Sequence, residues 1–108
     1  MNKAEAASTP GPWQLYVLEC RDGALYTGIS NDVARRYAAH CAGKGARYTR
    51  LNPPQRIALT HPFADKSQAL KAEYAFKRLS AAAKRQLVAH GDLSGWLAAR
   101  AALTDANQ

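Results

Sequence analysis

The sequence has too few cysteines for a disulfide framework and no apolar stretch long enough to span a membrane. Cys20 and Cys41 are the only two cysteines among 108 residues, and both lie in apolar patterns, so we expect reduced core thiols. No run approaches the roughly 18 apolar residues of a membrane span. Residues 1–12 lack the apolar core of an export signal and end in Pro-Gly-Pro. We therefore expect a cytoplasmic protein with no membrane partner.

Acidic residues are also scarce. The sequence has 8 Asp and Glu residues and 15 Lys and Arg residues, which gives a formal net charge of +7 and a pI of about 9.8. Such an excess attracts polyanions, and every phosphate that the protein neutralises releases counterions. Nucleic acid is therefore the expected class of partner. A basic protein with no nucleic-acid role is the alternative that charge alone leaves open.

The periodicity of apolar residues predicts an α+β fold of order β-β-α-β-α-α-α, in which helices flank a small three-stranded antiparallel sheet. The expected strands are residues 13–20, 25–29 and 56–61. The expected helices are residues 32–41, capped by Asn31, and residues 66–79, 81–89 and 93–103. Residues 47–50 are expected to be a basic link. We predict a flexible leader over 1–12, a main domain over 13–90, and a C-terminal helix with a frayed tail over 91–108.

The residues that could perform chemistry are spread over the chain. Tyr16 and Tyr26 lie on the first two strands, and Arg36 and His40 are four residues apart on one flank of a helix. Glu73 lies among apolar neighbours on a later helix, where a carboxylate is costly unless a cation compensates it. Each also has a plain structural reading: strand aromatics, a solvated arginine, a packed histidine, and an ion pair of Glu73 with Lys77 at i+4.

Together, the segments LYVLECRDGALYTGISNDVARRYAAHCAGKGARYTR and KSQALKAEYAFKRLS resemble the GIY-YIG nuclease family. The nearest resemblance is to its small stand-alone bacterial members related to the UvrC catalytic domain. It spans about residues 13–88 and depends on a constellation: two tyrosines ten apart, an arginine ten residues beyond the second, a histidine four further, and a glutamate on a late helix.

The resemblance implies a metal-dependent endonuclease that hydrolyses DNA phosphodiester bonds. It assigns Tyr16 and Tyr26 to the catalytic tyrosines, with Tyr26 as the first choice of base, and Arg36 to phosphate binding. It makes Glu73 the ligand of one Mg²⁺ or Mn²⁺ ion and His40 a proton relay, with no small-molecule cofactor. Many larger members carry an Asn after the glutamate, whereas this chain has none before Asn107. A non-catalytic DNA-binding module on the same scaffold is the alternative.

Basic residues near these positions are expected to contact DNA, single-stranded or branched DNA above all. The candidates are Arg35, Lys44, Arg47, Arg50 and Lys77 for phosphates and Tyr48 for a splayed base. A solvated loop is the alternative for residues 44–50. An RNA-binding protein would fit the charge but not the set of tyrosines, arginine and glutamate.

The turn between the first two strands decides whether both tyrosines share a site. A two-residue loop would place Tyr16 and Tyr26 on opposite faces, because side chains alternate along each strand. A three-residue loop, Arg21-Asp22-Gly23 with Gly23 in the left-handed conformation, pairs Leu18 with Tyr26 and puts both tyrosines on one face. We predict this second register.

Overall fold

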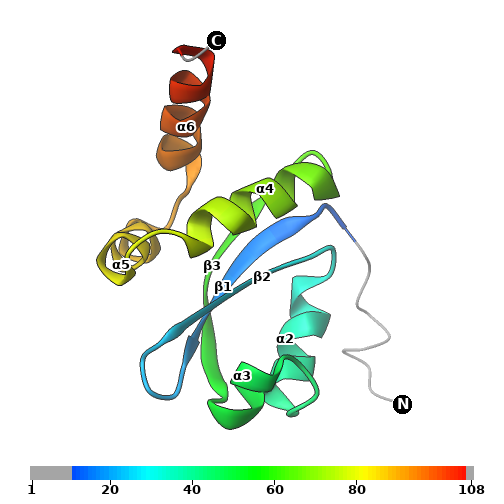
Figure 1. Ribbon diagram of the computed structural model, residues 1–108. Helices are drawn as coiled ribbons and strands as arrows, with labels where there is room; N and C mark the ends of the chain where they lie inside the picture. The colour runs from blue at the N-terminus through cyan, green and yellow to red at the C-terminus, as the bar shows by residue number, and fades with distance from the viewer. Residues whose placement is uncertain (1–10, 107–108) are drawn as a thin grey trace.

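The computed structural model describes residues 11–106, and their side chains as far as residue 103. The predicted leader therefore lies outside the described residues except for its last two. Three strands form one antiparallel sheet in the order β2-β1-β3, with β1 over Gln14–Cys20, β2 over Leu25–Ser30 and β3 over Pro54–Pro62. The predicted α+β class and three-stranded sheet are confirmed (Figure 1).

Five helices are found in the described residues: α2 (Val33–Cys41), α3 (Arg47–Leu51), α4 (Lys66–Lys77), α5 (Ala81–His90) and α6 (Ser94–Ala106). The prediction of a plain link over 47–50 was wrong, because α3 forms there. It has no side-chain N-cap, and its backbone bond from the Arg50 N–H to the Ala46 carbonyl is 3.1 Å long. A helix this short is not stable alone. Contacts with the rest of the fold must therefore stabilise it.

The hairpin adopts the odd register predicted from the sequence. Leu18 pairs with Tyr26 and Tyr16 pairs with Gly28. Gly23 has a φ of 86°, and its N–H donates to the Cys20 carbonyl at 2.8 Å. A left-handed residue at this point is easy for glycine and strained for other residues. The turn therefore directs both tyrosines to the same face of the sheet.

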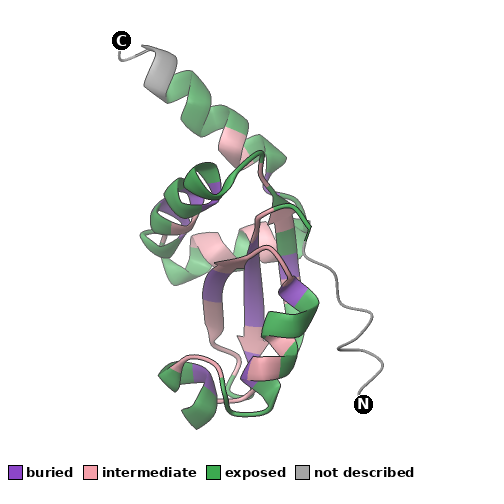
Figure 2. Cartoon of the chain, turned by 90° about the vertical axis from the view of Figure 1, so that its right-hand side faces the viewer, coloured by how far each residue is buried: buried purple, intermediate pink, exposed green. Residues whose placement is uncertain are grey.

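Each face of the central strand builds its own apolar cluster. On one face Leu15 and Val17 pack with Phe76 of α4 and with Leu93, which precedes α6. On the other face Tyr16 and Leu18 pack with residues of α2, with Tyr26 and Tyr37 partly buried around them. The buried segments concentrate on the strands, whereas α6 is exposed over most of its described length (Figure 2). β1 is thus covered on both sides.

Two details of α2 differ from the sequence-based expectation. Its N-cap is Asp32 rather than Asn31, since the Asp32 carboxylate accepts from the Arg35 N–H at 3.2 Å. Cys41 is exposed, although the spacing of Val33, Tyr37 and Cys41 predicted a buried stripe. Only Cys20 is a buried thiol. Within the part of the chain that the structure describes, no helix has the length and apolar character needed to cross a bilayer.

Candidate active site

The Tyr16 hydroxyl begins a buried chain of hydrogen bonds. Its oxygen lies 2.9 Å from Nε2 of His40, and Nδ1 of His40 lies 2.7 Å from Oγ1 of Thr49. The Thr49 hydroxyl lies 2.9 Å from the carbonyl oxygen of Ala46, to which it donates. His40 and Thr49 are fully buried, and Tyr16 is 2% exposed. Strand β1 and helices α2 and α3 each supply one of the three side chains.

Two glycines make room for this chain. A Cβ on Gly28 would lie 2.5 Å from the Tyr16 hydroxyl, so the Tyr16 ring lies directly over β2. A Cβ on Gly45 would overlap the His40 ring. Any larger residue at either position must displace the buried ring beside it. The absence of side chains at these two positions therefore shapes the site.

Three further charged or ionisable groups act electrostatically on the Tyr16 hydroxyl. Burial raises the pKa of Tyr16, the nearby Arg36 guanidinium opposes that rise, and Tyr26 and Glu73 add to it. The four residues come from β1, β2, α2 and α4. Since β2 is an edge strand, α2 and α4 can reach it from opposite faces of the sheet. Side chains from all four elements can therefore act on one hydroxyl near the edge of β2.

The electrostatics of His40 favour a neutral ring. Burial lowers the pKa of His40 below its ordinary value, and the positive charge of Arg36 lowers it further. An unperturbed histidine is already mostly neutral at pH 7. His40 is thus available as a proton acceptor at neutral pH.

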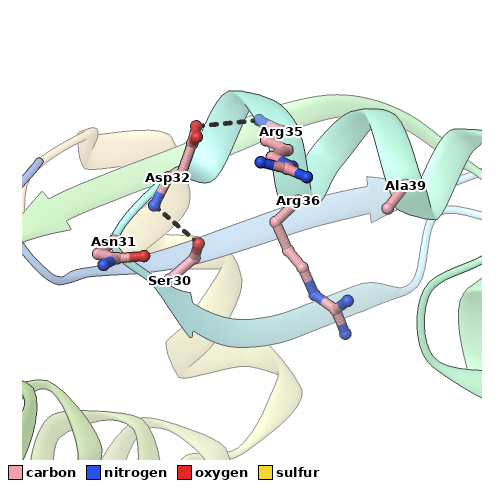
Figure 3. A pocket seen from close by; sticks show the side chains of 6 residues that line it. All are labelled: Ser30, Asn31, Asp32, Arg35, Arg36 and Ala39. Atoms are coloured by element: carbon pink, nitrogen blue, oxygen red, sulfur yellow. Dashed lines mark hydrogen bonds between the residues drawn. The ribbon is translucent and has the colours of Figure 1, made fainter. Parts of the chain in front are cut away.

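Arg36 lies at an open pocket on this edge. The pocket has a volume of about 280 Å³ and is lined by Ser30, Asn31, Asp32, Arg35, Arg36 and Ala39. Figure 3 shows the Arg36 side chain extending from α2 over β2, while the backbone N–H of Arg35 is held by Asp32. An exposed guanidinium in this position can meet the phosphate oxygens of an incoming strand.

Glu73 is a half-buried carboxylate with one cationic neighbour. Its side chain is 18% exposed, and its Oε2 lies 3.0 Å from Nζ of Lys77, which is well exposed. The plain reading of Glu73 as an i+4 ion-pair partner therefore holds in this structure. Because Lys77 is well exposed, solvent screens the pair, which contributes at most about 1 kcal/mol.

The donor set around Glu73 fits a hard cation that keeps most of its water. The described residues hold no group of three or more His, Cys, Asp or Glu side chains that could bind a metal. Mg²⁺ and Mn²⁺ accept one or two protein carboxylates together with waters and substrate phosphates. Glu73 fits this requirement, and a zinc-type cage is absent from residues 11–106.

Most of the predicted nucleic-acid contacts lie in or just before α3. Lys44, Arg47 and Arg50 are exposed in and before α3, next to the site. The Tyr48 ring stacks on Tyr26, with centroids 6.2 Å apart and planes 14° apart, and is 43% exposed. Its exposed surface is available to a base.

Thr49 is the site residue that sequence analysis missed. Its signal was weak, because threonine in a short basic segment has many ordinary uses. The nine-residue separation from His40 follows no helical spacing rule, since the chain turns at Gly43 and Gly45 between them. Asn107 is the first Asn after Glu73 in the sequence, and it lies outside the described residues.

This small antiparallel sheet and its flanking helices form a domain of the GIY-YIG type. The chain belongs to that nuclease family, because residues 12–86 match the GIY-YIG catalytic domain. This confirms the resemblance on which the site prediction depends. The match covers β1 to the middle of α5 and includes every residue of the candidate site.

More specifically, its relatives include UPF0213 proteins of bacteria. One from Cupriavidus pinatubonensis is 58% identical over 72 residues, covering 67% of this chain and 80% of the relative. One from Xanthomonas axonopodis pv. citri is 53% identical over 73 residues, which cover 68% of this chain and 72% of the relative. The solution NMR structure of the protein EF2693 from E. faecalis is 37% identical, covers 74% of this chain and 86% of its own, and has a TM-score of 0.51.

Proposed function

We propose that the protein is a metal-dependent endonuclease that hydrolyses phosphodiester bonds of DNA. The observation that carries this proposal is the buried hydrogen bond between the Tyr16 hydroxyl and Nε2 of His40, with Arg36, Tyr26 and Glu73 close enough to act electrostatically on that hydroxyl. A phenol, an imidazole, a guanidinium and a carboxylate are the groups that such a hydrolysis requires for proton transfer, phosphate binding and metal binding.

Tyr16 is our choice of general base, ahead of Tyr26. The Tyr16 hydroxyl is bonded to His40 Nε2, whereas the Tyr26 ring packs against His40 with centroids 5.2 Å apart. The Tyr16 O–H bond breaks as the proton passes to Nε2. The phenolate then takes a proton from the attacking water, whose oxygen bonds to phosphorus while the bond to the leaving oxygen breaks. The leaving oxygen takes a proton from solvent, and His40 returns its extra proton to solvent before the next turnover.

Arg36 and Glu73 complete the site. Arg36 presents a planar fork of N–H donors that matches two phosphate oxygens and stabilises their growing negative charge. Glu73 would hold one Mg²⁺ or Mn²⁺ ion. When bound, that ion supplies Lewis-acid stabilisation of charge on the phosphate and the leaving oxygen. Tyr26 lines the site next to His40 and supports Tyr48.

The substrate proposed is single-stranded or branched DNA. The exposed cations of residues 44–50 suit a phosphate backbone, and the exposed surface of Tyr48 suits an unstacked base. Base stacking on an aromatic ring contributes about 1–3 kcal/mol per base. Unpaired nucleotides provide that base without the cost of opening a duplex.

A cleavage assay with matched arginine variants tests the proposal. Single-stranded, duplex and branched DNA are incubated with Mg²⁺, Mn²⁺ or EDTA. We expect cutting with either metal and none with EDTA, and Arg36→Ala should lower kcat by about 10²–10³-fold because one charge-stabilising donor is lost. Arg35→Ala should weaken binding and leave kcat nearly unchanged. Binding without cutting under every condition would instead support the non-catalytic module.

The salt dependence of DNA binding tests the basic segment. In the triple variant Lys44→Ala, Arg47→Ala and Arg50→Ala, the slope of log K against log salt should become shallower by about 2 for single strands, since each phosphate contact contributes about 0.7. Fluorescence anisotropy over a salt series measures it. A control triple, Lys71→Ala, Arg78→Ala and Arg100→Ala, removes the same charge elsewhere. Equal slopes in the two triples would exclude residues 44–50 from the interface.

A further inference from the structure

The His40 ring has a partner on each nitrogen, and the direction of one bond determines the other. The Thr49 hydroxyl has a single hydrogen, which it donates to the Ala46 carbonyl at 2.9 Å. With its hydrogen placed there, the Thr49 oxygen accepts from His40 across the 2.7 Å contact, which puts the ring hydrogen on Nδ1. A neutral ring with hydrogen on Nδ1 has its lone pair on Nε2, facing the Tyr16 hydroxyl.

We propose that Thr49 is a positioning residue that holds His40 in the Nδ1–H tautomer, so that Nε2 can accept the Tyr16 proton. The inference rests on the proposed nuclease function and adds a residue to its proton path. It gives the short helix α3 a role, because α3 carries Thr49 to the buried nitrogen of His40. Gly45 contributes by leaving space for the His40 ring.

The same bond serves both states of the proton transfer. Before transfer His40 is neutral and Nδ1–H donates to Thr49. After transfer His40 is a cation in which both nitrogens are donors, and Nδ1–H still donates to Thr49 while Nε2–H faces the Tyr16 phenolate. The contact becomes a charge-assisted hydrogen bond, which is stronger than a neutral one. Burial and the Arg36 charge disfavour that cation, so a ready acceptor on Nδ1 matters more here.

The opposite arrangement is chemically possible and would have a different signature. If Thr49 donated to Nδ1, the Ala46 carbonyl would keep its bond from the Arg50 N–H at 3.1 Å. Nε2 would then carry the hydrogen and donate to the Tyr16 oxygen. In that tautomer His40 cannot take a proton from Tyr16 at Nε2. The ring nitrogens of His40 therefore report directly on the proposal.

Nitrogen NMR of the full-length, DNA-free protein measures the tautomer. The chain has three histidines, so ¹⁵N-histidine labelling in a His61→Gln, His90→Gln background leaves His40 as the single signal. We expect a protonated Nδ1 and an unprotonated Nε2 near pH 7 in this background and in Thr49→Ser. Thr49→Val, which keeps the shape and loses the hydroxyl, should shift the population toward Nε2–H. Hydrogen on Nε2 in the parent protein would overturn the proposal whatever the variants do.

The kinetics of DNA cleavage by Thr49 variants provide a second test. Because a wrong imidazole tautomer can cost up to about 10⁴-fold in kcat, we expect Thr49→Val to lower kcat by at least about tenfold, with KM changed less than about threefold. Thr49→Ser should restore most of the loss. Full activity in a folded Thr49→Val protein would overturn the positioning role. If no variant and no parent protein cuts DNA while His40 remains the Nδ1–H tautomer, the nuclease proposal fails and the tautomer assignment stands.

Discussion

Glu73→Gln is expected to lower metal-dependent DNA cleavage by about 10²–10⁴-fold. The change keeps the shape of the side chain and removes the negative charge that would hold the cation. Metal ions stabilise such transition states by several kcal/mol, and each 1.4 kcal/mol corresponds to about a factor of ten in rate. Cleavage rates over a Mn²⁺ titration measure the effect. Because the ion pair of Glu73 with the exposed Lys77 contributes little stability, we expect the loss of cleavage to reflect weaker metal binding rather than unfolding.

Two variants serve as controls for the Glu73 experiment. Glu19→Gln removes an equal charge from the Glu19–Arg56 ion pair at 2.6 Å, away from the site, and should leave cleavage nearly unchanged. Lys77→Gln removes the competing cation and should lower the Mn²⁺ concentration needed for half-maximal rate. Wild-type cleavage by Glu73→Gln at every Mn²⁺ concentration would exclude Glu73 as the metal ligand.

Tyr16→Phe is the second change with a large expected effect. Removing the hydroxyl deletes the base and leaves the buried Nε2 of His40 without its partner at 2.9 Å. We expect kcat to fall by about 10²–10⁴-fold, as for loss of a general base. We also expect a loss of about 1–3 kcal/mol in the free energy of unfolding, the usual cost of a buried group left unsatisfied. Single-turnover cleavage and urea unfolding measure the two effects.

Tyr26→Phe is the matched control for Tyr16→Phe. It makes the same chemical change on the neighbouring strand and keeps the ring that packs on His40 and Tyr48. Cleavage should persist at a rate well above that of Tyr16→Phe. If the ranking is reversed, the base is Tyr26, as the sequence alone first suggested. In that case the bond between Tyr16 and His40 serves to hold the histidine.

Much of the fold followed from local signals. Apolar and aromatic runs predicted all three strands, and the requirement that Tyr16 and Tyr26 share a face predicted the turn register and the left-handed Gly23. Helix α4 was predicted over residues 66–79 because Asp65 or Ser67 could cap it, and the structure has Asp65 as the N-cap of Lys66–Lys77. These features depend on residues close in sequence, which a pattern can detect.

The misses share a physical cause. Helix α3 has no capping side chain, and nothing in its five residues favours a helix over a loop. What holds it is the burial of Thr49 against His40, a contact that forms only when the chain reverses after α2. In the same way, Cys41 falls at a helical spacing typical of the core but lies where α2 ends and is exposed. Tertiary contacts decided both outcomes.

The three-residue turn at Arg21–Gly23 has a consequence for how this protein can evolve. Surface loops ordinarily tolerate insertions and deletions. Here a change of one residue would shift β2 by one position against β1, so that Tyr26 would leave the face it shares with Tyr16 or the ladder would have to break. Chain length at this exposed tip is therefore constrained as tightly as the side chains of the candidate site, which lie at a distance from it in the hairpin.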